Sequence, residues 1–247
     1  MVVSILIASI LAVVFIAFRV TLAKKNNEMG VVGVLLKTLA SIGFIAIAFT
    51  AIVMGGADGK GLDIKSVIFI VGGLIMGLIG DIILDLKVVY LKSKEEGVYL
   101  TGGMVSFGIG HVLYFVAMLL YFGSEIISWP IIGICIAVSA VGALGMVFGG
   151  EKLLKFNFGK FIIHSVIYAF MLLFMSALGI ATWVLAKEVN PHVPVFAIGM
   201  ILFLLSDVVL TQMYFGGRAK DDTLCVINHA LYYSAQICIA SFVFYMA

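Results

Sequence analysis

Two aspartates lie inside long apolar runs of this sequence, and the segments around them resemble each other. Asp81 is followed by Ile-Ile-Leu and Asp207 by Val-Val-Leu. An aspartate at the centre of a bilayer costs about 3 kcal/mol, so it is retained where a function or a partner offsets that cost. The two residues therefore indicate chemistry within the membrane. The simpler alternative is a structural role, as an ion pair with a lysine or as the cap of a broken helix.

A second carboxylate follows Asp81 at a spacing of one helical turn. Asp81 and Asp85 are four residues apart and share a helix face. Two neighbouring carboxylates in a low dielectric do not both ionise, so a neutral acid coexists with a carboxylate. This is the equipment for general acid and general base catalysis, and Lys37 nearby would favour the ionised partner. Two plainer readings stay open: Asp85 as a solvated helix end, and Lys37 as a lysine that snorkels to water.

Polar and aromatic residues recur on two further apolar runs. One run carries His111 and Tyr114. The other carries a stripe spaced at i, i+3, i+4 and i+7, made by His229, Tyr232, Tyr233 and Gln236. Such residues either form ordinary hydrogen bonds between helices or face the aspartates and orient substrate or water.

The composition restricts the protein to one class. The chain has 247 residues, of which 64% are hydrophobic and 11% charged, with a mean hydropathy of +1.25. A soluble domain cannot be this apolar. The net charge of +2 is too small to indicate nucleic acid, and the three cysteines lack CxxC spacing. We therefore expect a single transmembrane domain over residues 1–247.

The apolar runs predict an all-α protein with eight membrane-spanning helices, because each run supplies the roughly 20 residues that a span requires. The predicted spans are 2–22, 31–54, 66–86, 98–122, 126–149, 159–186, 193–215 and 224–246.

The loop charges predict the orientation. Eleven lysines and arginines follow the odd-numbered spans, and three follow the even-numbered ones. The eleven are Arg19, Lys24, Lys25, Lys87, Lys92, Lys94, Lys152, Lys155, Lys160, Arg218 and Lys220, and the three are Lys60, Lys65 and Lys187. The positive-inside rule places the odd loops in the cytoplasm and both termini outside. Polar residues of six spans then fall in the cytoplasmic half of the membrane.

The sequence also predicts an internal duplication. His111 is followed by Val-Leu-Tyr and His229 by Ala-Leu-Tyr, so the third and fourth spans echo the seventh and eighth. An offset of four spans gives a parallel 4+4 repeat with an axis along the membrane normal. Such an axis can bring Asp81 and Asp207 face to face.

With these residues in place, the sequence resembles the YhhN-like lysoplasmalogenase family of eight-span membrane proteins. The resemblance covers nearly the whole chain and rests on short motifs in a fixed order. They are Lys37, Gly80-Asp81 with Leu84, Phe107-Gly108 with His111 and Tyr114, Tyr168, Leu205-Ser206-Asp207, and Tyr233 with Ala235-Gln236. One departure is Thr38, where the family pattern often has proline; it concerns the shape of the second span.

The resemblance implies an intramembrane hydrolase that cleaves the vinyl ether bond of lysoplasmalogens to a fatty aldehyde and glycerophospho-ethanolamine or -choline. We predict Asp81 and Asp207 as the catalytic pair, with no metal or organic cofactor required. The residues predicted to bind substrate or support the pair are Lys37, Asp85, His111, Tyr114, Tyr168, Ser206, His229, Tyr233 and Gln236. The expected partners are a single-chain ether phospholipid and the bilayer. The expected location is a cell membrane if the source is bacterial.

Two alternatives remain at this stage. His111, His164 and His229 with an aspartate could ligate zinc in a lipid amide hydrolase, although no HExxH spacing supports it. The aspartates could instead relay protons in a proton-coupled transporter.

Overall fold

The chain is all-helical in the computed structural model, which describes residues 1–26, 30–57, 59, 61–89 and 96–246. Eight long helices and no strand occur among these residues, and all eight are long and apolar enough to cross a membrane. The helices are α1 Val2–Asn26, α2 Gly30–Val53, α3 Ile64–Val89, α4 Glu96–Ile126, α5 Trp129–Leu154, α6 Ile162–Ala186, α7 Val193–Phe215 and α8 Asp222–Phe242. Two short 3-10 turns, η1 Gly159–Phe161 and η2 Val243–Tyr245, lie before α6 and after α8.

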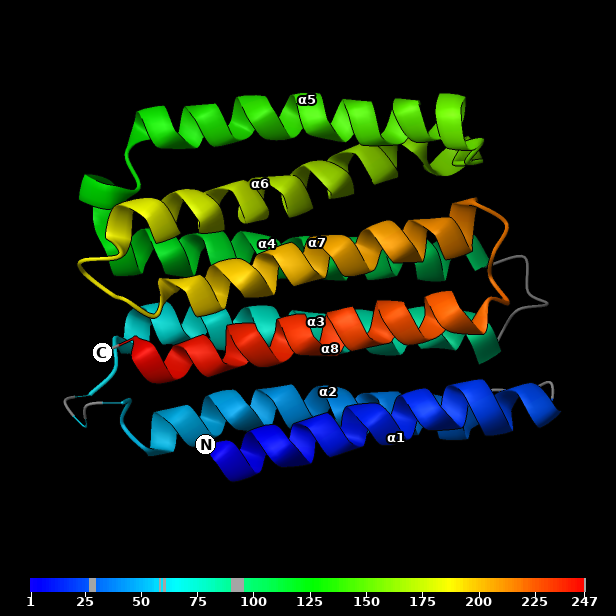
Figure 1. Cartoon of the computed structure of the whole chain (residues 1–247), viewed down its shortest axis with the longest axis horizontal. Helices are drawn as coiled ribbons and strands as arrows, with labels where there is room; N and C mark the ends of the chain where they lie inside the picture. Colours follow the sequence, from blue (N-terminus) through cyan, green and yellow to red (C-terminus); the bar gives the residue numbers. More distant parts are fainter. Residues whose placement is uncertain (27–29, 58, 60, 90–95, 247) are drawn as a thin grey trace.

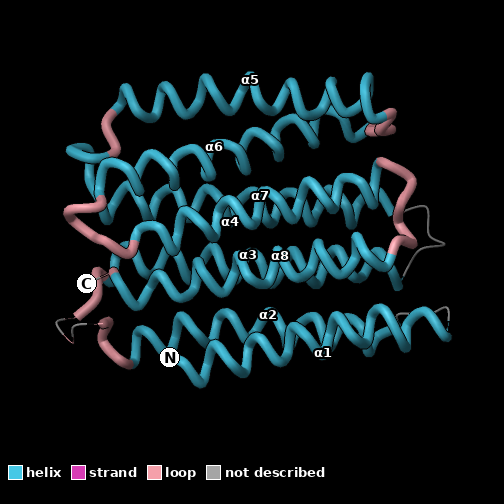
Figure 2. Tube along the Cα trace, in the orientation of Figure 1, coloured by secondary structure: helices cyan, strands magenta, loops and turns pink. Residues whose placement is uncertain are grey.

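The helices run side by side, and the connections gather at the two ends of the bundle (Figures 1 and 2). Helices α1 and α2 form one edge, and α5 and α6 form the other (Figure 1). Between them, α3 packs against α2, α4 and α8, and α7 packs against α6 and α8. The central position of α3 and α8 brings Asp81 close to the polar stripe of the last helix.

Most predicted spans lie within a few residues of the observed helices, and the seventh agrees at both ends. Pro194 occupies the first turn of α7, where a missing backbone N–H costs nothing. Gly216 follows the helix, and its N–H bonds the carbonyl of Gln212. A proline near the start and a glycine after the end predict helix boundaries well.

The fourth and fifth spans differ from their predicted bounds, since α4 ends at Ile126 instead of residue 122 and α5 covers Trp129–Leu154 instead of 126–149. Gly123, with φ 65° and ψ 178°, does leave the helical conformation where the fourth span was expected to end at residue 122. A further helical turn then continues to Ile126, and α5 begins at Trp129 instead of residue 126. Pro130 in the first turn fixes this later start, because proline is favoured there and broken helices resume at such points.

Glycines on α3 allow its neighbours to approach closely. A methyl group on Gly73 would lie 2.2 Å from the ring of Tyr114, and one on Gly77 would lie 2.8 Å from Nε2 of Gln236. Both contacts are far shorter than van der Waals packing allows. The two glycines therefore make room for the side chains that α4 and α8 direct towards the aspartates of α3.

Arg19 corrects the charge count used for the orientation. Counting it with the first loop was wrong, because Arg19 lies inside the apolar span Val2–Thr21 and its side chain pairs with Asp85. The other ten basic residues lie near the same ends of the odd spans or in the loops after them. The side chains of Lys24, Lys25, Lys60, Lys87, Lys92 and Lys94 lie outside the described residues. The orientation and the 4+4 repeat remain predictions.

Candidate active site

Four charged side chains form a cluster between α1, α2 and α3. The Lys37 ammonium lies 3.3 Å from Oδ1 of Asp81 and 3.0 Å from Oδ1 of Asp85. The Arg19 guanidinium lies 3.3 Å from the same oxygen of Asp85. Lys37 and both aspartates are buried. Burial of unpaired charges would cost several kcal/mol each, so the cluster persists because two cations match two carboxylates.

Hydroxyl groups complete the surroundings of Asp81. Ser41 of α2 donates a hydrogen bond of 2.6 Å to Oδ2 of Asp81, and Tyr232 of α8 donates one of 2.7 Å to the same oxygen. The Tyr232 hydroxyl in turn accepts a bond of 3.0 Å from Gln236, whose oxygen is 3.4 Å from the hydroxyl of Tyr114. An oxygen that accepts two hydroxyl donors beside a lysine is arranged for a negative charge.

Asp207 on α7 has very different neighbours. Its Oδ2 accepts a hydrogen bond of 2.5 Å from the Tyr168 hydroxyl of α6. No lysine or arginine among the described residues pairs with it. The adjacent Ser206 points to the carbonyl of Phe203, and its own carbonyl accepts a bond of 2.7 Å from Asn228. Asp207 is therefore a buried carboxyl group without a compensating cation.

The two aspartates line one polar cavity of about 340 Å³. Its wall combines the ion cluster with residues of α7 and α8 and with Lys220 of the α7–α8 loop. The polar lining residues are Arg19, Lys37, Asp81, Asp85, Asp207, Tyr214, Lys220, Asn228, His229 and Tyr232. Asp81 and Asp207 thus line the same cavity, while the repeat axis expected to bring them face to face stays a prediction.

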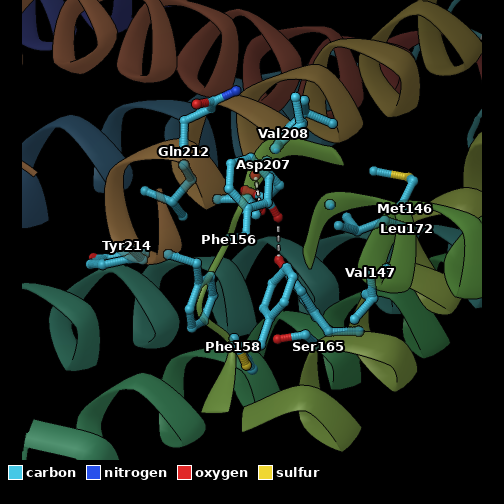
Figure 3. A pocket seen from close by; sticks show the side chains of 18 of the residues that line it. Met146, Val147, Phe156, Phe158, Ser165, Leu172, Asp207, Val208, Gln212 and Tyr214 are labelled. Carbon is cyan, nitrogen blue, oxygen red and sulfur yellow. Dashed lines mark hydrogen bonds between the residues drawn. The ribbon is translucent and has the colours of Figure 1, made fainter. Parts of the chain in front are cut away.

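A second cavity, of about 390 Å³, adjoins the first and is almost wholly apolar. It lies between α4, α5, α6 and α7, and Figure 3 shows Asp207 and Ser165 on its wall among apolar side chains. The two cavities share the lining residues Leu84, Phe107, Asp207, Leu210 and Tyr214. Asp207 therefore lines both the polar cavity and the apolar cavity, at the place where the two adjoin.

Five of the predicted site residues line neither cavity. Among the predicted set, Lys37, Asp85 and His229 line the polar cavity and Tyr168 lines the apolar one. The residues that line neither cavity are His111, Tyr114, Ser206, Tyr233 and Gln236. Tyr114 and Gln236 still connect to Asp81 through Tyr232.

The two buried histidines each form a hydrogen bond to the backbone carbonyl four residues earlier in their own helix. Nδ1 of His111 lies 2.8 Å from the carbonyl of Phe107, and Nδ1 of His229 lies 2.7 Å from the carbonyl of Cys225. A carbonyl only accepts, so Nδ1 carries the proton and Nε2 is the free nitrogen. His164 is exposed and stands apart from both cavities.

The simpler readings of Asp85 and Lys37 are wrong. Asp85 is 2% exposed and bound to two cations, so it is no solvated helix end. Lys37 is 6% exposed and its ammonium faces the aspartates, so it does not snorkel to water. Both belong to the buried cluster.

Sequence reasoning missed Arg19, Ser41 and Lys220. Arg19 had a usable signal, since apolar residues continue after it and extend α1. Ser41 lies four residues after Lys37 and so shares its helix face. Lys220 had no signal beyond its position shortly after the C-terminal end of α7.

The geometry does not support the zinc alternative. Within the described part of the chain, no group of three His, Cys, Asp or Glu side chains is arranged to hold a metal. His229 lines the polar cavity, whereas His111 and His164 line neither cavity, so the three histidines do not converge on the aspartates.

A comparison with models of protein families identifies the family of this chain. The model of the YhhN family matches residues 32–243, which include every helix that contributes a carboxylate to the site. Searches of curated proteins and of solved structures give no match. Because the family match covers most of the sequence, this chain belongs to the YhhN family.

Proposed function

We propose that this protein is an intramembrane hydrolase that cleaves the vinyl ether bond of lysoplasmalogens. The observation that carries the proposal is the position of Asp207, at the junction of a polar cavity that also holds Asp81 and an apolar cavity. A lysoplasmalogen has the same division, because its vinyl ether joins one hydrocarbon chain to a glycerophosphate headgroup. Membership of the YhhN family supports this choice of substrate.

The headgroup end of the substrate matches the polar cavity. Arg19, Lys37 and Lys220 contribute positive charge to its wall. Lys37 is engaged by the two aspartates, whereas Lys220 is exposed and makes no ion pair with a described residue. A phosphate bearing negative charge would be attracted to Lys220 and Arg19.

The surroundings of the two aspartates favour a different proton-transfer role for each. Asp81 is held beside Lys37 and accepts two hydroxyl donors, so it serves as the carboxylate. Asp207 pairs with no cation among the described residues, and an isolated charge there would be costly, so it serves as the neutral acid. A neutral and an ionised carboxyl group together provide general acid and general base catalysis.

The proposed reaction begins when Asp207 transfers its proton to the alkene carbon that does not bear oxygen. The adjacent carbon becomes an oxocarbenium ion, which the Asp81 carboxylate stabilises electrostatically. Water then attacks the oxocarbenium carbon and loses a proton to Asp81, which gives a hemiacetal. Collapse of the hemiacetal returns the hydroxyl proton to Asp207, and the proton on Asp81 goes to the departing glycerol oxygen. The products are a fatty aldehyde and the glycerophospho-alcohol, and both acids regain their starting states.

The test is turnover by the purified protein in detergent, measured in deuterated water by mass spectrometry. We expect an aldehyde that carries one deuterium on the carbon next to the carbonyl, together with a slower rate than in ordinary water. The matched control substrate is the saturated alkyl ether, which lacks the alkene and should not react. Aldehyde without deuterium, after correction for exchange, would contradict the mechanism.

The same preparation separates the alternatives. A transporter would show no turnover in detergent. A metal-dependent amide hydrolase would cleave an N-acyl lipid and lose activity with a chelator, whereas vinyl ether cleavage by the two aspartates should survive it.

A further inference from the structure

The apolar cavity reaches the outer surface of the bundle along α5. Gly145, Met146, Leu153 and Leu154 line the cavity and are also exposed. Helix α5 lies at the edge of the bundle and packs mainly against α6 (Figure 1). The α5–α6 connection, with Phe156 and Phe158, closes the end of the cavity nearest the loops. The open side of the cavity therefore faces the region that lipid occupies in a membrane protein.

Two glycines of α5 form part of this open wall. Gly145 and Gly149 are four residues apart and line the cavity together. A GxxxG pair in a membrane helix normally allows a second helix to approach closely. Here a methyl group built on either glycine would have no described atom within 4 Å. The missing side chains thus provide empty volume instead of a helix contact.

A buried hydroxyl on the opposite wall indicates the kind of occupant. Ser165 of α6 is 7% exposed, lines the same cavity, and has no hydrogen-bond partner among the described residues. A buried hydroxyl left unpaired costs about 1–3 kcal/mol, so a partner is expected from the occupant. Ser165 precedes Tyr168 by three residues, which places both on one face of α6. A ligand with an oxygen near Asp207 and a hydrocarbon chain beyond it would give Ser165 a hydrogen-bond acceptor and would fill the apolar space beside α5.

We propose that the apolar cavity binds the hydrocarbon chain of a single-chain lipid, that the chain enters from the bilayer past Gly145 and Gly149, and that these glycines set the chain length accepted. In this arrangement Ser165 donates a hydrogen bond to an oxygen of the lipid close to the start of its chain. The inference rests on the proposed function for its substrate. The cavity and its glycine wall can nevertheless be tested without turnover.

The first test compares substrates of two chain lengths. Gly149→Leu places a side chain in open cavity space and should reduce kcat/KM for a long-chain lysoplasmalogen about tenfold or more, because small changes in an apolar pocket have effects of this size. A chain half as long should lose less than about threefold. The matched control is Gly133→Leu: Gly133 is also on α5 with no described atom near its built methyl group, but it lies outside the cavity. An equal loss for both chain lengths, or no loss for either, would refute the proposed role of the glycine.

The second test needs no catalysis. A saturated alkyl lysophospholipid with a photoreactive group at the chain end is activated in detergent micelles, and the labelled peptides are identified. We expect labelling within residues 145–154 in the wild-type protein and in Gly133→Leu, and at least about a fivefold decrease in Gly149→Leu. Even labelling of all lipid-facing helices would refute the chain site. If this labelling is found while vinyl ether cleavage is not, the chain site stands and the proposed reaction fails.

The third test addresses the buried hydroxyl. Ser165→Ala should weaken binding of the same alkyl probe about threefold to tenfold, the usual effect of one lost hydrogen bond. Its labelling pattern and its ratio of long-chain to short-chain activity should equal those of the wild type. Unchanged affinity would show that the hydroxyl makes no bond to the lipid.

Discussion

The two aspartates proposed as the catalytic pair of this YhhN protein have contrasting surroundings. Asp81 belongs to a network that contains Lys37, Ser41 and Tyr232, so its carboxylate is matched on every side that the structure describes. Asp207 accepts a hydrogen bond from the Tyr168 hydroxyl, pairs with no lysine or arginine among the described residues, and borders an apolar cavity. The two residues come from similar sequence segments, Gly-Asp-Ile-Ile-Leu and Ser-Asp-Val-Val-Leu. The surrounding helices, and not the local sequence, therefore give the two carboxyl groups different environments.

This difference implies that substitutions around Asp81 and substitutions around Asp207 should affect stability and activity differently. The Asp81 side carries charges whose mutual pairing contributes to folding, so its loss should affect both stability and activity. The Asp207 side carries a single polar bond at a cavity wall, so its loss should affect activity alone. The predictions below run from the largest expected effect to the smallest.

The largest effect is expected from the aspartates themselves. Asp81→Asn and Asp207→Asn should each lower kcat for vinyl ether cleavage by at least about a hundredfold, because each removes a proton-transfer group. The double variant should be little slower than either single variant, since members of one catalytic unit are not additive. Mild losses that add in the double variant would indicate structural roles instead. Gel filtration and the unfolding temperature in detergent provide the control for folding.

Loss of Lys37 should damage stability as well as activity. Lys37→Met leaves the buried carboxylates of Asp81 and Asp85 with Arg19 as their remaining cation, and breaking such a pair costs about 3–5 kcal/mol. The unfolding temperature should fall clearly below that of the wild type, and activity should fall more than tenfold. A variant with normal stability would show that the cluster is less tightly coupled than its distances indicate. If Lys37→Met does not fold, Ser41→Ala provides a milder change beside the same carboxylate.

Loss of the Tyr168 hydroxyl should reduce activity without affecting stability. Tyr168→Phe removes the 2.5 Å hydrogen bond from the Tyr168 hydroxyl to Asp207 and keeps the ring in the cavity wall. We expect kcat to fall about tenfold, consistent with a lost bond to a reacting group, while the unfolding temperature stays within a few degrees of the wild type. A drop in stability as large as that of Lys37→Met would remove the contrast between the two sides.

The smallest effects are expected from the histidines outside the two-acid unit. His164→Gln should match the wild type, because His164 is exposed and lines neither cavity. His111→Gln should cost a few fold at most, since His111 contacts the site through Phe107 and Phe203. Activity after treatment with a chelator should remain. Complete loss in any of these experiments would favour metal chemistry over the two-acid mechanism.

The sequence predicted the helices better than it predicted the site. Apolar length, Pro194 and Gly216 were enough to place α7 correctly, because membrane spans are defined by local properties. The apolar residues after Arg19 indicate that α1 continues past it, but the partner of Arg19 was not predictable, because Asp85 lies 66 positions away in the sequence.

The apolar cavity was beyond sequence reasoning for a related reason. Most of its lining residues are Leu, Met, Phe and Gly, which also face outwards elsewhere on the bundle. Only the packing of α4 to α7 distinguishes the two settings. Asp207 was recognisable from its charge, whereas Ser165 was not, since serines are common in membrane helices and many bond their own backbone.

The balance of charge around Asp81 has an electrical consequence. Arg19 and Lys37 supply two positive charges, Asp81 and Asp85 supply two negative ones, and the cluster is neutral. The proposed proton transfers run between Asp207, the lipid and Asp81, which line adjoining cavities in one half of the bundle. Moving an elementary charge across a bilayer involves about 2.3 kcal/mol for each 100 mV or so of potential. The proposed catalytic cycle moves no net charge across the bilayer. Turnover in proteoliposomes should therefore be independent of membrane voltage and should generate no current.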